Sequence, residues 1–299
     1  MKKILFLLWL PLVLQGCDGS LDSNQEELDQ FVLDSSIWTV QLGTGTNDSA
    51  QGLSIDSQGN LYLAGYTSGD LQGNGNAGKQ DLVLVKYNSN GDRQWTRQLG
   101  SSGDDVAFAS ATDSKGNVYA AGYTEGGFDG NTHEGNFDLF LVKYDTNGNK
   151  QWHKEYGNSD NETIFDIATY KSEYVILVGY TAGVLGSKNY GNKDILIIKY
   201  DSSGKRIWTK QYGSSESDYA RGVGLDSSKN IYVVGDTSGS FKSQNSGSED
   251  LFIIKYNEDG DEEEWSNQIG SFSNDVAFDV AIDSSGNSYV TGYTGSSLD

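Results

Sequence analysis

The stretch Asp105-Val-Ala-Phe-Ala-Ser-Ala-Thr-Asp-Ser-Lys-Gly-Asn-Val-Tyr-Ala-Ala-Gly-Tyr-Thr124 decides the fold, because versions of it recur along the chain. The other versions occupy residues 48–67, 162–181, 218–237 and 275–294. Each version contains two runs of small, β-branched or aromatic residues with a period of two, separated by a short polar turn. Such runs predict two antiparallel strands joined as a hairpin.

Tryptophans mark the same period. They lie at Trp38, Trp95, Trp152, Trp208 and Trp265, at spacings of 57, 57, 56 and 57 residues. After each of the first four hairpins, a loop leads to an Asp-x-x-x-x-Lys-Tyr strand that ends at Tyr87, Tyr144, Tyr200 or Tyr256, and the next Trp-containing strand follows. Four short strands in a unit of this length are typical of a propeller blade. The sequence therefore predicts an all-β propeller.

The first strand of each unit carries small residues on one face, for example Ala107, Ala109 and Ala111. We expect this face to surround the central axis, where the innermost strands crowd together. The alternate positions, such as Phe108 and Phe165, are then expected to pack against the neighbouring blade.

Two motifs give the chain a resemblance to a known family. Gly59–Thr67, Gly116–Thr124 and Gly286–Thr294, together with the Asp-x-x-x-x-Lys-Tyr strands, resemble the SBBP-type bacterial β-propeller repeat and, more loosely, the NHL repeat. The resemblance implies a secreted propeller and no single activity. The third unit departs from it, because Tyr170-Lys-Ser-Glu-Tyr174 replaces the Asp-x-x-Gly-Asn turn, which puts the shape of that turn in doubt.

The strand count predicts five blades in one domain, residues 31–299. Four complete units begin near residues 50, 106, 163 and 219, and a fifth begins near residue 276 and stops at Thr294 after two strands. Phe31-Val-Leu-Asp-Ser-Ser-Ile-Trp38 is similar to the missing strands, so we expect residues 31–42 to complete the last blade. Closure removes the free sheet edges that promote aggregation. The alternative is an open fragment of a larger propeller.

Residues 1–16 resemble the signal peptide of a bacterial lipoprotein. Two lysines precede an apolar run over residues 4–14, which is too short to span a bilayer. Leu14-Gln-Gly-Cys17 resembles a lipobox, and Cys17 is the one cysteine of the chain. We therefore expect a lipid on Cys17 that holds the protein to a membrane of the bacterial cell envelope, facing the periplasm or exterior. Residues 17–30 would form the lipidated cysteine and an acidic tether.

Charge and composition exclude several classes of partner. The 299 residues include 42 acidic and 21 basic side chains, a formal net charge of -21, which argues against nucleic-acid binding. A single cysteine cannot support a disulfide framework. We expect a monomer.

Chain direction sorts the connections onto two faces. The hairpin turns lie on one face, and the opposite face, here called the loop face, holds the variable loops 68–80, 125–137, 182–193 and 238–249. At the loop face a carboxylate recurs where each inner strand begins, as Asp48, Asp105, Glu162, Asp218 and Asp275. Five such carboxylates around one axis would suit a cation, and the cation that fits such a ring best is calcium. The interpretation that we favour is that each carboxylate accepts hydrogen bonds from backbone amides of its own or the next blade.

Catalytic signatures are weak. The two histidines, His133 and His153, do not recur and form no zinc or Ser/His/Asp pattern. Asp166 and Asp279 lie on inner strands and are the best acid/base pair for a glycoside hydrolase. Near-identical blades favour binding, because an active site breaks symmetry and repeated binding does not.

These features predict a lipid-anchored, extracytoplasmic propeller that acts as a non-catalytic binding or scaffolding module through its loop face. The alternative is a glycan-binding propeller lectin with equivalent sites on several blades. A glycoside hydrolase is the third interpretation.

Overall fold

The computed structural model describes residues 38–73, 75–131, 133–241, 243–261 and 263–298. The predicted signal peptide, the lipidation site at Cys17, the tether and residues 31–37 lie outside this part of the chain. Within it, no helix is long and apolar enough to cross a membrane.

Five antiparallel sheets contain the regular structure, apart from one short 3₁₀ helix, η1 (Phe128–Gly130). The first sheet contains β1 (Asp48–Ile55), β2 (Leu61–Thr67), β3 (Asp81–Tyr87) and β4 (Arg93–Leu99), and the second contains β5 (Asp105–Thr112), β6 (Val118–Thr124), β7 (Asp138–Tyr144) and β8 (Lys150–Tyr156). The third contains β9 (Glu162–Tyr170), β10 (Tyr174–Thr181), β11 (Asp194–Asp201) and β12 (Arg206–Tyr212). The fourth contains β13 (Asp218–Leu225), β14 (Ile231–Thr237), β15 (Asp250–Tyr256) and β16 (Glu263–Ile269), and the fifth contains β17 (Asp275–Ile282) and β18 (Ser288–Thr294).

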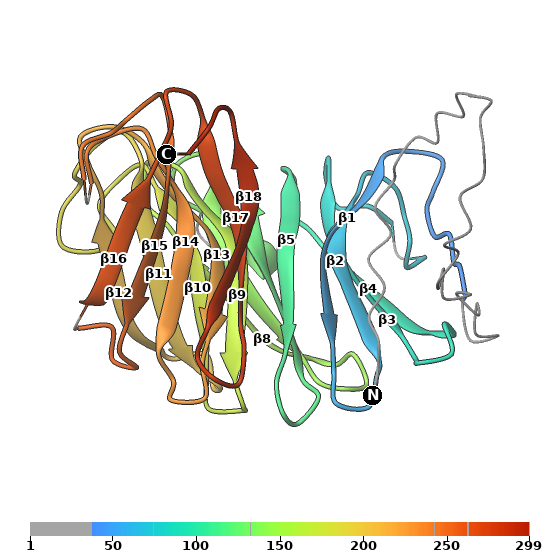
Figure 1. Cartoon of the computed structure of the whole chain (residues 1–299). Helices are drawn as coiled ribbons and strands as arrows, with labels where there is room; N and C mark the ends of the chain where they lie inside the picture. The colour runs from blue at the N-terminus through green and yellow to red at the C-terminus, as the bar shows by residue number, and fades with distance from the viewer. Residues whose placement is uncertain (1–37, 74, 132, 242, 262, 299) are drawn as a thin grey trace, which may run out of the picture. The chain divides into compact units, whose positions relative to one another are not determined.

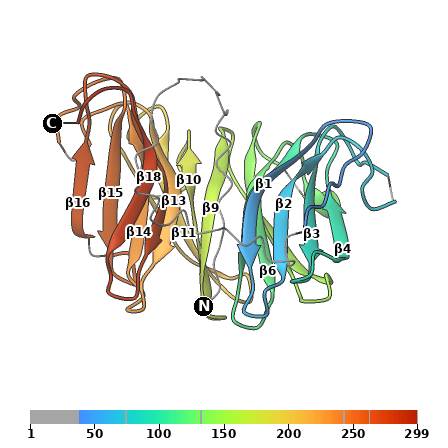
Figure 2. The same ribbon diagram turned by 45° about the vertical axis from the view of Figure 1, so that its right-hand side comes forward.

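In each sheet the strands pair in chain order, so the predicted four-stranded antiparallel units are confirmed. Figure 1 shows the sheets side by side, from the blue and cyan strands β1–β4 to the red strands β17 and β18. The inner strands β1, β5, β9, β13 and β17 each contact the next along this series. The view in Figure 2 shows the same succession of sheets from another side.

The third strands explain why the sequence between the loops is so apolar. Asp81-Leu-Val-Leu-Val-Lys-Tyr87 is buried along its whole length, and so is Asp138-Leu-Phe-Leu-Val-Lys-Tyr144. A strand covered on both faces needs a continuous apolar run, and alternation is lost. The outer strand β4 has exposed positions and keeps polar residues between Trp95 and Leu99.

The expectation for which side chains of the inner strands face the axis is wrong, because each of these strands carries a bulge. In all five, the pairing register shifts at the fourth residue, and these bulged residues are Gln51, Phe108, Phe165, Arg221 and Phe278. They line a cavity on the axis, whereas Ala107 and Ala111 are buried between blades. A β-bulge inserts one residue and reverses the alternation beyond it. Phe108 and Phe165 therefore face the axis and not the neighbouring blade.

Buried lysines fasten the first four sheets to one another. The lysine of the Asp-x-x-x-x-Lys-Tyr strand donates to the carbonyl oxygen of a hairpin turn in the following sheet. The pairs are Lys86 with Thr146, Lys143 with Ser202 and Lys199 with Glu258, at N–O distances of 2.9 to 3.0 Å. The Trp95 indole donates to the same Thr146 carbonyl at 3.2 Å. Two repeated side chains thus converge on one carbonyl and fix the spacing of neighbouring blades.

The third unit keeps its hairpin although its turn motif differs. β9 ends at Tyr170 and β10 begins at Tyr174, and the two rings stack at a centroid distance of 5.5 Å. Lys171 takes a positive φ of 51° in the turn. The turn is therefore reshaped, while the flanking strands keep their places.

The predicted closure is not shown by the structure. In the described residues β18 pairs only with β17, and residues 38–42 form no strand. Trp38 instead stacks on Tyr87 of the first sheet at 6.0 Å, and Leu42 packs in the same cluster. The predicted pairing partners in residues 31–37 lie outside the described part of the chain.

Candidate functional site

The carboxylate at the start of each inner strand forms hydrogen bonds within its own blade. Asp105 is fully buried and accepts from the backbone N–H of Ser101 at 2.6 Å and from the Ser101 hydroxyl at 3.0 Å. The Thr124 hydroxyl at the end of β6 also donates to Asp105. One side chain thus joins the connection before β5, the strand β5 itself and the end of β6.

The other four carboxylates repeat this arrangement. Their donors are Thr44 and Thr67 for Asp48, Asn158 and Thr181 for Glu162, Ser214 and Thr237 for Asp218, and Ser271 for Asp275. In each blade the residue four positions before the carboxylate gives its backbone N–H. The arrangement therefore matches the hydrogen-bonding interpretation derived from the sequence.

The predicted calcium site stays a prediction. Within the described part of the chain, no three His, Cys, Asp or Glu side chains gather closely enough to hold a metal ion. The structure therefore places these carboxylates at equivalent points of the five sheets, as Asp48, Asp105, Glu162, Asp218 and Asp275, without bringing them together at one centre.

A second set of carboxylates was missed by the sequence analysis. Asp81, Asp138, Asp194 and Asp250 begin the third strands and are buried. The sequence signal that could have revealed them is the aspartate that begins each Asp-x-x-x-x-Lys-Tyr strand. Asp81 accepts from the backbone N–H of Ala77 at 2.9 Å and from the Gln98 amide at 2.8 Å, so it closes the loop before β3 and ties this loop to β4.

A glycine separates the two sets of carboxylates at each junction between blades. A Cβ atom on Gly157 would lie 2.1 Å from Asp138 Oδ1 and 2.9 Å from Glu162 Oε2. Gly213 holds the same position between Asp194 and Asp218. Only glycine fits there, and its Cα–H group faces a carboxylate oxygen that has no conventional donor in the described residues.

Burial shifts the titration of these groups. Burial raises the pKa of Asp105 to about 6, although hydrogen bonds from Ser101 and Thr124 oppose the shift, and the charge of Asp81 adds to it. Burial likewise raises the pKa of Glu162 to about 6, with a contribution from Asp138. At Asp48 burial also acts upward, but hydrogen bonds from threonines outweigh it, so its pKa lies below the ordinary value.

The axial cavity brings the proposed acid/base pair to one place. It has a volume of about 190 Å³ and is lined by residues of all five inner strands, including Asp166 and Asp279. Asp166 accepts from the backbone N–H groups of Ile167 and of Val223 in the next blade, both at 2.8 Å. Burial raises the pKa of Asp166 to about 7, the two amides oppose this, and Asp279 adds to it.

Blade four breaks the symmetry of this cavity. In three blades the bulged phenylalanine lies against a tyrosine of the second strand, in the pairs Phe108–Tyr123, Phe165–Tyr180 and Phe278–Tyr293, at 5.7 to 5.9 Å. Blade four has an ion pair between Arg221 and the buried Asp236 instead. The Arg221 guanidinium also lies 5.7 Å from the Phe165 ring and 5.8 Å from the Phe278 ring.

The two histidines lie in the second unit and contact acidic residues. His133 Nδ1 is 3.3 Å from Asp138 Oδ2, and His153 Nε2 is 3.5 Å from Glu155 Oε1. His133 therefore links its loop to the start of β7, and His153 contacts another residue of its own strand, β8.

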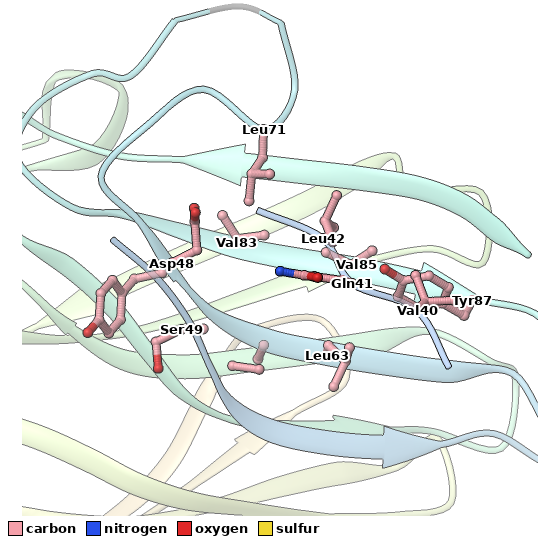
Figure 3. A pocket seen from close by; sticks show the side chains of 14 residues that line it. Val40, Gln41, Leu42, Asp48, Ser49, Leu63, Leu71, Val83, Val85 and Tyr87 are labelled. Atoms are coloured by element: carbon pink, nitrogen blue, oxygen red, sulfur yellow. The ribbon is translucent and has the colours of Figure 1, made fainter. Parts of the chain in front are cut away.

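A larger hollow of about 300 Å³ lies on the first sheet. Figure 3 shows Leu63, Val83 and Val85 on its floor, with Leu42 and Leu71 beside them. Its lining is mainly aliphatic. On the other sheets the equivalent face packs against the preceding blade, so this hollow marks the end of the series.

The raised pKa values predict a pH dependence of stability. Asp105 and Glu162 bind more protons in the folded chain between their ordinary values of 3.8 and 4.5 and the folded value of about 6. Their contribution to the free energy of unfolding therefore increases as the pH falls from 7 to about 5 and is lost as the pH rises. Urea denaturation followed by tryptophan fluorescence measures this slope.

The matched control is the double variant Asp105→Asn/Glu162→Gln, which removes both titrations. The slope of the variant over the same range should be flatter than that of the unsubstituted chain. The slope that remains in the variant reports the other titrating groups, among them Asp166, whose pKa burial raises to about 7. Equal slopes would contradict the pKa assignment.

Comparisons with known proteins agree with the repeat architecture. A family model described as a beta-propeller repeat, SBBP, matches residues 37–72, 94–129, 207–242 and 264–299. The regulatory protein FlaEY of Caulobacter vibrioides is 26% identical over 183 residues, which are 53% of this chain and 19% of that protein. The match thus spans a small share of this curated relative.

Similar solved structures have low sequence identity. BamB from Moraxella catarrhalis aligns with a TM-score of 0.43 at 12% identity, over 81% of this chain and 61% of that chain. The Pan2 WD40 domain of Neurospora crassa aligns with a TM-score of 0.48 at 12% identity, over 88% and 68%. The gluconolactonase XC5397 from Xanthomonas campestris aligns with a TM-score of 0.45 at 10% identity, over 84% and 72%.

The four matched repeats coincide with four of the five hairpin units seen in the structure, and the unmatched third unit is the one whose turn differs. The chain is an SBBP-type β-propeller repeat protein.

Proposed function

We propose that this protein is a non-catalytic binding or scaffolding module, held to a membrane of the bacterial cell envelope by a lipid on Cys17, with its loop face as the binding surface. A specific partner and a monomeric state remain predictions from the sequence, and a calcium site at the five carboxylates remains the alternative to structural hydrogen bonding. The observation that carries the proposal is the contrast between the two faces of the blades.

The hairpin face is uniform because its polar side chains are used in the turns. Asp113 Oδ1 accepts from the backbone N–H groups of Lys115 and Asn117, and Asp113 Oδ2 accepts from the Asn117 amide. Asp56, Asp145, Asp226 and Asp283 make the same set of bonds. Such turns offer few free groups to a partner.

The loops of the loop face share their anchoring contacts and differ in sequence elsewhere. One anchor is the backbone N–H group that donates to the aspartate at the start of the third strand. In each loop, the backbone N–H of an apolar residue also donates to a side chain of the fourth strand, in the pairs Leu71–Gln98, Phe128–Glu155, Leu185–Gln211 and Phe241–Gln268. Anchored loops of different sequence on a rigid scaffold are where proteins carry recognition.

The hydrogen bonds of Asp166 in the axial cavity support a structural role for this carboxylate better than a catalytic one. Both oxygens of Asp166 accept backbone N–H groups, and one of these belongs to the neighbouring blade. An acid/base catalyst needs an oxygen aimed at its substrate. Glycoside hydrolysis therefore remains the third interpretation, after a binding or scaffolding module and a propeller lectin.

The proposal includes a closed ring of five blades, completed by residues 31–42. Two observations support it. The axial cavity is lined from β1 at Gly52 and Leu53 and also from β17 at Phe278 and Asp279, so the first and last inner strands flank one space. Trp38 donates to Ser89 O and lies over Gly91, as Trp95 donates to Thr146 O and lies over Gly148. Trp38 thus occupies the place of a fourth strand before the first blade.

A disulfide tests the closure directly. In the first junction the hydroxyls of Ser54 and Ser110 are 3.0 Å apart. In a ring of five, the equivalent positions of the last junction are Ala281 and Leu53. We expect the full-length variant Cys17→Ser/Leu53→Cys/Ala281→Cys to form an intramolecular disulfide under mild oxidation, measured by peptide mass spectrometry.

The positive control is Cys17→Ser/Ser54→Cys/Ser110→Cys, which bridges two blades already in contact. If the control forms its disulfide and the Leu53/Ala281 variant forms none, or forms it only between two chains, the five-bladed closure is wrong.

The binding role is tested by photo-crosslinking in cells that produce the full-length chain. A benzoylphenylalanine in place of Val184 on the loop face should give a discrete adduct, because Val184 is an exposed apolar residue of a variable loop. The same residue in place of Lys115, on the hairpin face, should give none. Adducts from the hairpin face alone, or from neither position, would contradict the proposed binding surface.

A further inference from the structure

We propose that the hollow beside Phe272, at the junction of the fourth and fifth blades on the loop face, is a binding site for a neutral saccharide. The inference rests on the proposed binding function and names the ligand class of one site on that face. It predicts one such site and not one per blade.

Phe272 is the most exposed large apolar side chain reported for the described residues, at 90% of its full accessible surface. It lies in the connection between β16 and β17, next to Ser271, whose backbone N–H donates to Asp275. The repeat places Gly45, Ser102, Ser159 and Ser215 at the equivalent position of the other connections. The fold therefore does not need an aromatic side chain at this position.

The surroundings of this ring form a polar hollow of about 450 Å³. Its lining residues are Gln244, Asn245, Ser246, Gly270, Ser271, Phe272 and Ser297. None of these residues carries a charge, although the chain as a whole has a formal net charge of -21. A ligand held by such a lining is neutral and offers hydroxyl or amide groups to amides and hydroxyls.

The framework of the hollow is fixed. Asn245 accepts from the backbone N–H of Gly247 at 2.9 Å and donates to Thr237 O at 3.3 Å. Gly247 packs so closely on the β16–β17 connection that a Cβ there would lie 2.5 Å from Ser271 O. Among the described residues, the exposed Gln244 side chain has no hydrogen-bond partner. The hollow thus combines a rigid base with the Phe272 ring and the Gln244 amide, neither of which contributes packing or a hydrogen bond to the fold in the described residues.

A saccharide matches this combination better than other neutral ligands. A pyranose ring has an apolar face of C–H groups, which stacks on an aromatic ring, and a rim of hydroxyl groups, which bond to amides and to ordered water. A protein partner buries about 800 Å² on each side and uses several clustered anchors. One exposed ring in one hollow is too small a contact area for a protein partner, and it is large enough for a sugar residue.

Titration calorimetry tests the site with the full-length Cys17→Ser chain and four neutral probes: cellohexaose, mannohexaose, xylohexaose and chitohexaose. We expect at least one probe to bind with a dissociation constant of about 1 mM or tighter and a stoichiometry near one. Phe272→Ser should weaken that binding about tenfold or more. Because serine already occupies this position in three other connections, the variant should fold, which its melting temperature verifies.

Two further variants serve as controls. Phe272→Tyr keeps the ring and should retain affinity within about threefold, and Ile207→Ser removes an exposed apolar side chain of the outer strand β12 and should leave saccharide binding unchanged. Equal affinities of the Phe272→Ser and unsubstituted chains would overturn the proposal, and so would the absence of binding of all four probes at about 10 mM. If the probes fail while benzoylphenylalanine at Val184 still captures a partner, the saccharide site is wrong and the binding module stands.

Discussion

The hydrogen bonds of the carboxylate that begins each inner strand hold the architecture together. Asp105 joins the backbone of Ser101 to the hydroxyl of Thr124, and it does so at the point where one blade ends and the next begins. Removal of such a buried acceptor leaves an N–H group without a partner, at a cost of about 1–3 kcal/mol. The chain repeats the contact five times, so the connections that cross between blades all leave the outer strand with one geometry. The glycine of each junction follows from it, since Gly157 lies where two carboxylates leave no room for a Cβ atom.

The lysine contacts join neighbouring blades on the hairpin face, opposite the carboxylates. Lys143 crosses from its own strand to the Ser202 carbonyl of the next blade, while it also lies over the ring of Tyr119 at 5.0 Å. A buried ammonium is tolerated there because a carbonyl, an aromatic face and the carboxylate of Asp113 at 3.9 Å surround it. The first four sheets are therefore fastened to one another at both faces, and the loops between these contacts are free to differ.

Much of this architecture could be predicted from the sequence, because the repeat supplies five versions of the same pattern. The hairpin of β5 and β6, the turn at Asp113–Asn117 and the carboxylate Asp105 were all predicted. The bulge at Phe108 could not be predicted from alternation, since a period-two pattern carries no sign of an inserted residue. The burial of Asp81 was missed because a repeated aspartate before an apolar run also fits an exposed strand start. The exposure of Phe272 depends on what surrounds one connection in space, and no local pattern reports this.

Two departures from the repeat lie in the last two units, besides Gln51 in the first unit and the turn of the third. Arg221 and Asp236 replace a phenylalanine and a tyrosine at the axis, and Phe272 replaces a serine at the loop face. The polar side chains that recur in every unit are used in structural hydrogen bonds. We therefore expect a single ligand to be recognised by side chains that depart from the repeat, such as Arg221, Asp236 and Phe272. The central claim is that the five repeated carboxylates hold the blades through hydrogen bonds and do not depend on a cation. The most direct test is thermal unfolding of the full-length Cys17→Ser chain in EDTA and in a calcium titration up to about 5 mM. The account predicts an unchanged midpoint. A rise of several degrees, which is what about 2.7 kcal/mol of calcium binding would produce, would contradict it, provided that Asp105→Asn abolishes the rise.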